Sequence, residues 1–289
     1  MGKSIKFLQD RERILLERAK DLEYKEVADG ENLSIHFYFP ADIEDGPDRP
    51  VILFFNGGGW DRGNIVEFAP HALYFIERGA VCGLVEYRNA KSHPESTPVE
   101  SLKDGRSAVK FVRQHREQLH VDSDKVIVCG SGAGGNIAAH SAMKPKSRVE
   151  EESDSRPNAV ILFSSIIDVE KGSYGFDQFQ EPGDAKRACL TRFIDSGLPP
   201  MLIMHGTDDR LVPLFEVSLF AERMKKRKNV CELVELEGRD RNFFNLNVDP
   251  GSYEICLSTI DDFLDQQGLL PRDETADEAR VISWREEDY

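Results

Sequence analysis

The glycine-rich stretch at residues 125–140 contains the residues best placed for covalent chemistry. Apolar residues 126–129 lead through Gly130, Ser131 and Gly132 into a run of small residues. An apolar strand that turns sharply into a helix is the layout that exposes a nucleophilic serine. Ser131 stands one position earlier than this layout requires. Whether the turn carries a nucleophile therefore decides whether the chain can be an enzyme.

Three further polar segments also follow directly after apolar runs. In an open parallel sheet, binding and catalytic sites form at the carboxyl ends of the strands. Segments that follow different strands therefore meet at one edge of such a sheet and can build a single site together with the stretch at 125–140. The three segments are residues 56–60, 205–213 and 237–245.

Apolar strands and amphipathic helices alternate from residue 51 onward, which predicts parallel strands joined by helical crossovers. The uninterrupted apolar run at 51–55 is typical of a strand buried on both faces. Residues 24–27 and 33–39 indicate two leading strands that form an antiparallel edge. The predicted fold class is α/β, with about eight mostly parallel strands in a doubly wound sheet and helices on both faces. Further strands are predicted at 80–87, 125–129, 158–163, 200–205 and 230–236, and helices at 65–77, 97–119, 213–227 and 253–264.

The length of 289 residues fits one α/β domain, and no repeat or low-complexity linker divides the chain. We therefore expect a single domain over 1–289. Within it, an N-terminal helix is expected in residues 1–23, a lid or pocket wall in 168–198, and an acidic surface tail in 271–289. A charged excursion is expected at 148–156.

The chain is strongly acidic, with 52 Asp and Glu against 37 Lys and Arg and a net charge of −15. Such a surface repels nucleic acid and anionic lipid, so neither is an expected partner. The N-terminus contains no apolar run that predicts a signal peptide or a membrane span. Five scattered cysteines form no Cys-x-x-Cys pair. Buried free thiols, no metal, no cofactor and a cytoplasmic location are the expectations.

The four strand-end segments, in this order, resemble those of the α/β-hydrolase fold. The resemblance is to its hormone-sensitive-lipase-like and acetyl-esterase-like branch of small carboxylesterases, and it covers roughly residues 24–270. In that branch a His-Gly-Gly-Gly-Trp-like loop donates backbone N–H groups to an oxyanion. Asn56 stands in place of the histidine here. The resemblance implies oxyanion donors at Gly58, Gly59 and Ala133, and a pocket that includes Asn56, Gly57 and Trp60.

The branch carries its nucleophile in a Gly-x-Ser-Ala-Gly-Gly-Asn-like turn. Alignment on residues 133–136 places Gly132 at the nucleophile position, and a glycine has no side chain that can attack a carbonyl. The competing register makes Ser131 the nucleophile. We favour the first register, because the second shortens the turn between the strand and the elbow.

The remaining members of the triad also depart from the family pattern. Asp209 matches the acid position. Its structural alternative is the role of a helix N-cap residue ahead of Pro213. The base position is occupied by Arg241, and no histidine follows His205. Arginine stays protonated in proteins and cannot accept a proton from serine. The resemblance thus implies a triad that has lost its base and, in the favoured register, its nucleophile.

These residues favour a catalytically impaired esterase homologue that binds a small anion or carboxylate, with Arg241 paired to Asp209. One alternative is an active carboxylesterase that uses Ser131 with a base such as His140, His93 or His71. Another is a structural or interaction domain without a ligand. The partner is accordingly a small-molecule ligand or ester, and the sequence does not predict the oligomeric state.

Overall fold

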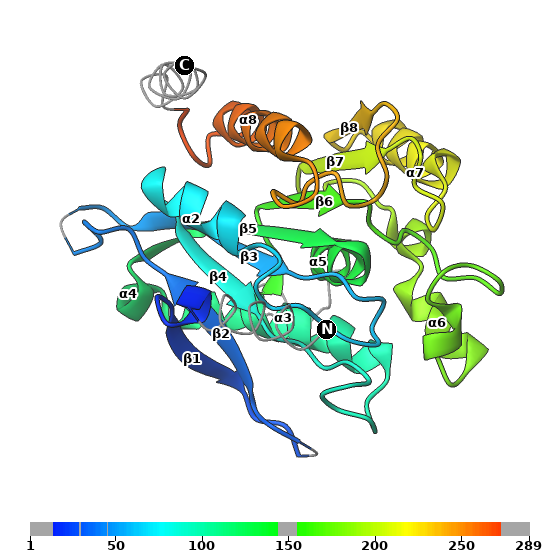
Figure 1. Cartoon of the computed structure of the whole chain (residues 1–289), viewed down its shortest axis with the longest axis horizontal. Helices are drawn as coiled ribbons and strands as arrows, with labels where there is room; N and C mark the ends of the chain where they lie inside the picture. Colours follow the sequence, from blue (N-terminus) through cyan, green and yellow to red (C-terminus); the bar gives the residue numbers. More distant parts are fainter. Residues whose placement is uncertain (1–13, 29, 45, 144–154, 273–289) are drawn as a thin grey trace.

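An eight-stranded sheet forms the centre of the computed structural model, which describes residues 14–28, 30–44, 46–143 and 155–272 (Figure 1). The strands lie in the order β1-β2-β4-β3-β5-β6-β7-β8. The pairs β1–β2 and β2–β4 are antiparallel and all other pairs are parallel, so the predicted sheet with its antiparallel edge is confirmed. The strands are β1 (Lys20–Lys25), β2 (Leu33–Tyr38), β3 (Arg49–Phe55), β4 (Val81–Val85), β5 (Val121–Ser131), β6 (Ala159–Phe163), β7 (Met201–Gly206) and β8 (Cys231–Leu236).

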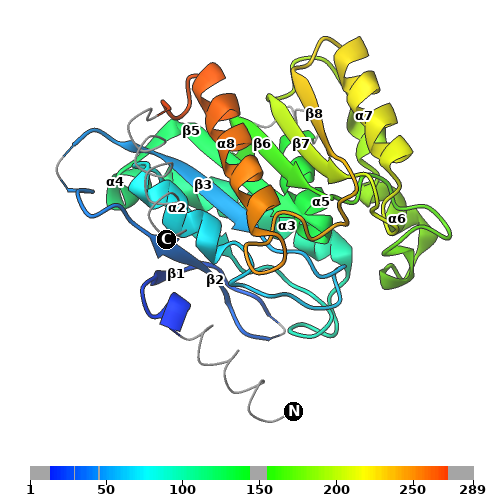
Figure 2. The same cartoon turned by 45° about the horizontal axis from the view of Figure 1, so that its top comes forward.

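Helices cover both faces of the sheet, as the alternating pattern predicts (Figure 2). Successive residues of a strand point to opposite faces, so Leu53 packs in one apolar core and Phe54 in the other. The core around Leu53 includes residues of α3, α5 and α7, and the core around Phe54 includes residues of α2 and α8. These helices are α2 (Ala69–Glu77), α3 (Pro98–Gln114), α5 (Gly132–Met143), α7 (Leu214–Lys226) and α8 (Pro250–Gln266).

The predicted N-terminal helix is wrong over residues 20–23, because β1 begins at Lys20. Lys20 pairs with Phe37 and Leu22 with Ile35 along β2. This pairing satisfies main-chain donors and acceptors that a short exposed helix would leave to water, so it overrides a weak helical pattern. Residues 14–16 are helical, and the rest of the predicted helix before them lies outside the described residues.

The helix predicted at 97–119 divides into two helices. α3 begins after Thr97, which forms a reciprocal capping box with Glu100, and it ends at Gln114. The short helix α4 (Arg116–Leu119) follows, and His120 then takes a left-handed conformation with φ of 52° that redirects the chain into β5. Most of the excursion predicted at 148–156 and of the tail predicted at 271–289 lies outside the described residues.

The segment between β6 and β7 is compact and is tied to α5. The Asn136 side-chain amide donates to the carbonyl oxygens of Ile166 and Ala188, each at 2.8 Å. These bonds fix the start of the segment and the end of α6 (Pro182–Ala188) against the helix that follows β5. The segment holds η2 (Phe176–Gln178), α6 and η3 (Leu190–Phe193), a region expected from sequence to form a lid or a pocket wall.

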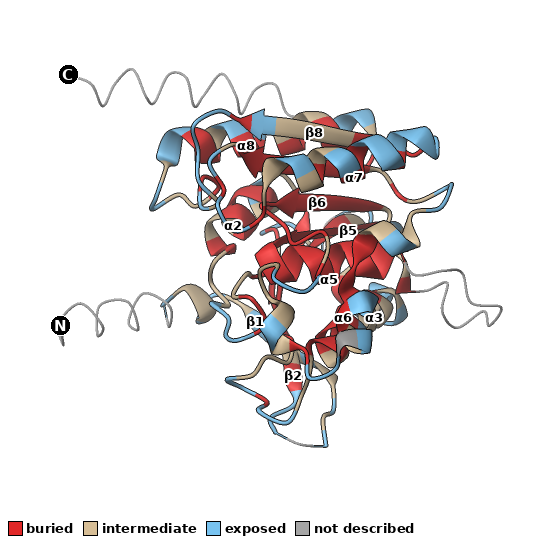
Figure 3. Cartoon of the chain, turned by 90° about the vertical axis from the view of Figure 1, so that its right-hand side faces the viewer, coloured by how far each residue is buried: buried red, intermediate tan, exposed pale blue. Residues whose placement is uncertain are grey.

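The central strands and α5 are almost wholly buried, whereas α7 and β8 keep an exposed face (Figure 3). All twelve residues of α5 are buried, which is unusual for a helix at the surface of a sheet. The turn between β5 and α5 therefore has little freedom, and it lies where the ends of β3, β6 and β7 also converge.

Candidate functional site

Gly132 occupies the sharp turn between β5 and α5. Its φ of +50° lies in the left-handed region, where a side chain adds strain, while Ser131 is the last residue of β5. The backbone thus has the strained strand-to-helix turn of a nucleophile elbow, and a glycine holds the strained position. A Cβ built on Gly134 would lie 2.2 Å from the carbonyl oxygen of Phe55, so the second glycine lets α5 pack directly on the end of β3.

The glycine loop after β3 presents free backbone donors beside this turn. Gly58 and Gly59 have φ of +131° and +65°, which a residue with a side chain rarely adopts. Among the described residues, no hydrogen bond is accepted from either of their N–H groups. The loop is held from behind, because the hydroxyl of Tyr87 donates to the carbonyl oxygen of Asn56 at 2.7 Å.

Glu67 connects the glycine loop to the turn and is a residue that the motif analysis missed. Its Oε2 accepts from Gly57 N–H and from the Ser131 hydroxyl, each at 2.7 Å. Burial raises the pKa of the Glu67 carboxyl, although these two hydrogen bonds and the charge of Arg241 act in the opposite direction. The only signal in the sequence is a single acidic residue among apolar neighbours just before α2.

Asp209 is bound within its own loop and not by Arg241. Its Oδ1 accepts from Leu211 N–H at 2.8 Å and from Val212 N–H at 3.1 Å, which is a local turn-capping arrangement. Its buried Oδ2 accepts no hydrogen bond within the described part of the chain and lies 3.8 Å from Nε2 of His205. The predicted ion pair between Asp209 and Arg241 is therefore wrong, since local N–H groups already hold the carboxylate.

His205 is engaged within the loop that follows β7. Its Nε2 donates to the Val212 carbonyl oxygen at 3.0 Å, and burial lowers its pKa. The ring is fully buried beneath the loop that follows β7. His205 therefore belongs to the packing of this loop.

Arg241 extends its guanidinium to the turn at Gly132. A Cβ built on Gly132 would lie 2.8 Å from Arg241 Nη2, and the guanidinium carbon lies 5.3 Å from the centre of the Tyr174 ring. This is a cation–π distance. Within the described residues, no hydrogen bond or ion pair engages the five guanidinium donors. Arg241 thus occupies the space into which a side chain at position 132 would project.

These groups surround a cavity of about 280 Å³, which we call the inner cavity. Tyr174 brings the segment between β6 and β7 into its wall, and the buried Ser164 hydroxyl in the wall has no hydrogen-bond partner among the described residues. The lining residues are Gly57, Gly58, Glu67, Ser131, Gly132, Phe163, Ser164, Tyr174, Leu211, Arg241, Asn242 and Phe244.

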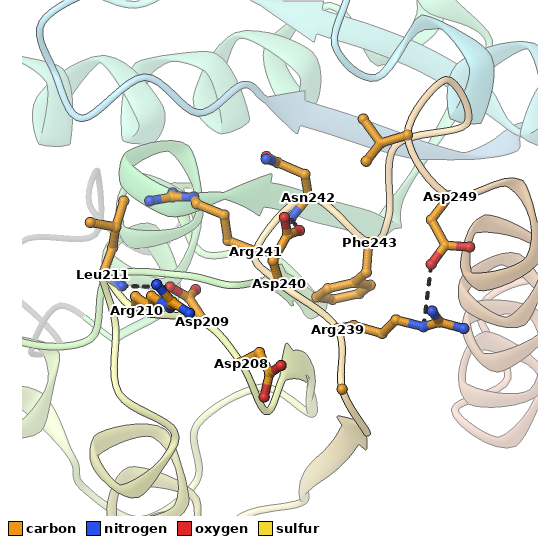
Figure 4. A pocket seen from close by; sticks show the side chains of 12 residues that line it. Asp208, Asp209, Arg210, Leu211, Arg239, Asp240, Arg241, Asn242, Phe243 and Asp249 are labelled. Atoms are coloured by element: carbon orange, nitrogen blue, oxygen red, sulfur yellow. Dashed lines mark hydrogen bonds and ion pairs between the residues drawn. The ribbon is translucent and has the colours of Figure 1, made fainter.

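A wider outer cavity of about 600 Å³ adjoins the inner one, and Leu211, Arg241 and Asn242 line both (Figure 4). Figure 4 shows that its wall is built by the loops after β7 and β8, from which Asp209 and Arg241 project. The outer cavity carries acidic and basic side chains in similar number. It gives the inner cavity an open, polar approach.

Trp60, Asn56, Gly59 and Ala133 were expected at the site but do not line the inner cavity. Trp60 is buried, packs edge-on against Phe179 at 5.4 Å and does not line the inner cavity, so its expected pocket role stays a prediction. Asn56 lines a separate cavity together with Tyr87 and His93. Gly59 lies against the Tyr174 hydroxyl, and Ala133 is fully buried at the start of α5.

None of the three histidines considered as bases reaches Ser131. His140 is bonded to Arg106 at 2.9 Å, and His93 is bonded to Ser92 and to a carbonyl oxygen of the β1–β2 connection. His71 is buried among aromatic rings, and burial lowers its pKa to about 3. The Ser131 hydroxyl meets Glu67 instead.

The described residues contain no group of three His, Cys, Asp or Glu side chains arranged to hold a metal ion. Over the same residues, no helix combines the length and the apolar character that crossing a membrane requires. All five cysteines are buried free thiols, as the sequence predicts.

The chain matches a family model and is similar in sequence to proteins of other organisms. Residues 35–224, more than half of the chain, match the BD-FAE family model. The chain is 24% identical over 226 residues to the probable carboxylic ester hydrolase LipM of Mycobacterium tuberculosis, covering 71% of this chain and 51% of that protein. It is 25% identical over 231 residues to the probable isoprenylcysteine alpha-carbonyl methylesterase ICMEL1 of Arabidopsis thaliana, covering 71% of this chain and 47% of that one. The chain thus spans about half the length of these curated relatives.

A solved structure is similar over nearly its whole length. Esterase 2 of the planctomycete Thermogutta terrifontis, solved with butyrate bound and with propionate bound, superposes with a TM-score of 0.81 at 34% identity. Each of these matches covers 89% of this chain and 97% of the other. The match in family, fold and order of parts confirms the resemblance drawn from the sequence. The chain belongs to the BD-FAE family and has the α/β-hydrolase scaffold of a carboxylesterase.

Proposed function

We propose that this chain is a catalytically impaired member of its family that binds a small carboxylate in the inner cavity through Arg241. The observation that carries the proposal is the position of the Arg241 guanidinium, 2.8 Å from where a side chain at Gly132 would begin. A fixed cation takes the place of the nucleophile. The Arg241 guanidinium at the centre of the site can therefore bind an anion, but it cannot act as a nucleophile on an ester.

The lost side chains explain why hydrolysis is impaired. A glycine at position 132 has no nucleophilic atom, and a guanidinium cannot accept a proton at neutral pH. Removing the nucleophile or the base of a serine triad costs on the order of 10⁶ in turnover. Backbone donors at Gly58 and Gly59 stabilise charge, but by themselves they leave only slow hydrolysis.

Three features support a carboxylate as the ligand. Arg241 offers planar, paired N–H donors that match a carboxylate, and they are not engaged by the described residues. The Ser164 hydroxyl and the Gly58 N–H add neutral donors around the same cavity. The similar esterase of Thermogutta terrifontis was solved with butyrate and with propionate, which are carboxylates of the size expected here.

Calorimetric titration with sodium butyrate tests the proposal. We expect millimolar binding (roughly 1 mM) by the wild-type chain. Arg241→Gln removes the charged donors, and a hydrogen bond between charged groups is typically worth enough to weaken binding at least about tenfold. Arg187→Gln is the matched control, since Arg187 is exposed and only faces Asp184 on α6. Absence of binding, or equal binding by Arg241→Gln, would refute the proposal.

A second candidate function keeps hydrolysis by the displaced Ser131. The observation in its favour is the 2.7 Å hydrogen bond from the Ser131 hydroxyl to Glu67, which could accept the proton. Against it, Ser131 is only 3% exposed, and its hydroxyl is turned under the glycine loop. We expect no labelling of Ser131 by a fluorophosphonate probe. Labelling that Ser131→Ala abolishes would favour this candidate over the first.

The inner cavity argues against a purely structural domain. The aromatic residues Phe163, Tyr174 and Phe244 lie in its wall but leave about 280 Å³ open. Arg241, Glu67 and Ser164 give the same wall polar groups that can contact a ligand. The five buried free thiols support a cytoplasmic site of action, where thiols remain reduced.

A further inference from the structure

The inner cavity presents a second charged group besides Arg241. Glu67 lines the cavity, and its Oε2 is engaged by Gly57 N–H and the Ser131 hydroxyl. Its other oxygen, Oε1, accepts no hydrogen bond from any described residue. One carboxylate oxygen is thus anchored to the protein, and the second is left for a donor in the cavity.

Glu67 and Arg241 flank the same two glycines but do not pair with each other. Oε1 of Glu67 lies 3.6 Å from a Cβ built on Gly57, and Nη2 of Arg241 lies 2.8 Å from a Cβ built on Gly132. That Cβ position at Gly132 is 4.0 Å from the Cα of Gly57. The two charged groups are therefore neighbours across the floor of the cavity, yet no ion pair within 4.0 Å joins them in the described part of the chain.

Glu67 Oε1 and the Arg241 guanidinium both lack a hydrogen-bond partner among the described residues. A ligand that pairs with both groups is therefore favoured. A simple carboxylate engages Arg241 but leaves Glu67 Oε1 without a donor, and a partly buried charged oxygen without a hydrogen bond is costly. A ligand that also carries a donor removes this cost. The chemistry of the wall therefore goes beyond recognition of a bare carboxylate.

We propose that the ligand is a short carboxylic acid that also carries a hydrogen-bond donor, a hydroxyl or an ammonium group, with Arg241 holding the carboxylate and Glu67 accepting from the donor. This inference rests on the proposed function and names the ligand class of the same site. Glu67 then discriminates between acids, whereas Arg241 binds all of them.

A series of four-carbon acids tests the assignment on the wild-type chain. The probes are butyrate and its 2-, 3- and 4-hydroxy and amino derivatives, each titrated at pH 6, pH 7 and pH 8, because burial raises the pKa of Glu67. We expect at least one derivative to bind roughly tenfold more tightly than butyrate, because a hydrogen bond to a charged group is worth at least that factor. If only hydroxy acids gain, the donor is a hydroxyl; if only amino acids gain, it is an ammonium group.

Glu67→Gln provides the second measurement. The amide oxygen can still accept from Gly57 N–H and Ser131, so the amide N–H₂ then faces the cavity and a donor on the ligand has no acceptor. We expect the preference for the derivative to disappear while butyrate affinity changes less than about threefold. Glu222→Gln, on the exposed face of α7, is the matched control and keeps the preference.

The outcomes separate the two proposals. Binding that is lost in Arg241→Gln, with no derivative tighter than butyrate, leaves the carboxylate function standing and overturns the role of Glu67. A preference that survives Glu67→Gln also overturns that role. Absence of Arg241-dependent binding by every acid in the series overturns the proposed function itself. The wild-type series gives a decision even if Glu67→Gln does not fold.

Discussion

At the scale of single residues, Glu67 is held in the site by contacts that no local pattern encodes. Its partners lie 10 and 64 residues away in the chain, at Gly57 and Ser131. A sequence motif is recognised by the spacing of residues within one segment, whereas the contacts of Glu67 depend on two distant segments. Arg241, by contrast, lies within the segment 237–245, and the resemblance to the family places it at the base position.

Glu67 should make the stability of the protein depend on pH. Its folded-state pKa is raised from the ordinary 4.5 by burial, so ionisation costs more in the folded chain than in the unfolded chain. This penalty is absent well below pH 4.5, grows as pH rises from about 4.5 to the folded pKa, and stays constant above the folded pKa. We expect the free energy of unfolding of Glu67→Gln, relative to wild type, to increase from pH 4 to pH 8.

Urea unfolding at several pH values measures this difference. Glu222→Gln is a suitable control, because that exposed side chain faces only Lys226. A difference between Glu67→Gln and wild type that stays constant or falls with rising pH would contradict the assigned environment of Glu67.

At the scale of elements, the β5–α5 turn and the loop after β8 act on each other. The turn lacks a side chain at Gly132, and the loop supplies Arg241 to the space that a side chain would need. A substitution at Gly132 in the turn therefore changes the space available to Arg241 in the loop, and the reverse also holds. The predicted Arg241–Asp209 pair failed for a related reason, since the loop after β7 satisfies Asp209 with its own N–H groups.

Restoring hydrolysis should require changes in both elements. Gly132→Ser alone brings a Cβ to within 2.8 Å of Arg241 Nη2 and provides no base, so we expect no gain in p-nitrophenyl acetate hydrolysis. With Arg241→His added, the clash is removed and a base is present. Members of a triad act as a unit, so we expect the double variant to exceed either single one by at least about 100-fold.

Gly132→Ser combined with Arg187→His is the control for the double variant, because the new histidine is then exposed on α6. Activity of Gly132→Ser alone equal to that of the double variant would show that Arg241 does not block the turn. A folded double variant without activity would show that the cavity has changed beyond these two positions.

At the scale of the whole molecule, the sequence predicts the sheet well because burial on both faces leaves an unmistakable pattern. Apolar runs such as 51–55 and 201–204 can only be central strands, and the polar segments after them must meet at one edge. The first strand was misassigned, because residues 20–25 lie at the edge and are only half-buried. Edge strands depend on a partner far along the chain and carry little pattern of their own.

Asp104 joins this antiparallel edge to the parallel body of the sheet. Its buried carboxylate accepts from Lys25 at 2.6 Å and from the Arg88 guanidinium at 2.7 Å and 2.9 Å. Asp104→Asn leaves both cations without a counter-charge. We expect a loss of about 3 kcal/mol in the free energy of unfolding, at the lower end for a broken buried pair because Lys25 is partly exposed.

Asp124→Asn, at an exposed position of β5, is the matched control and should change stability by less than about 0.5 kcal/mol. Urea unfolding of both variants decides the matter. A loss below about 1 kcal/mol for Asp104→Asn would mean that the edge strands hold to the body by apolar packing alone.

The left-handed backbone at Gly132 also bears on how this chain can evolve. A serine introduced there would carry strain of about 1–3 kcal/mol at a φ of +50°, before any catalytic benefit. It would also displace the arginine on which the proposed ligand depends. Substitutions arise one at a time, and each step toward a hydrolase first weakens folding or binding. Selection for ligand binding would therefore conserve the glycine and the arginine together, and homologues that share this function should vary at both positions or at neither.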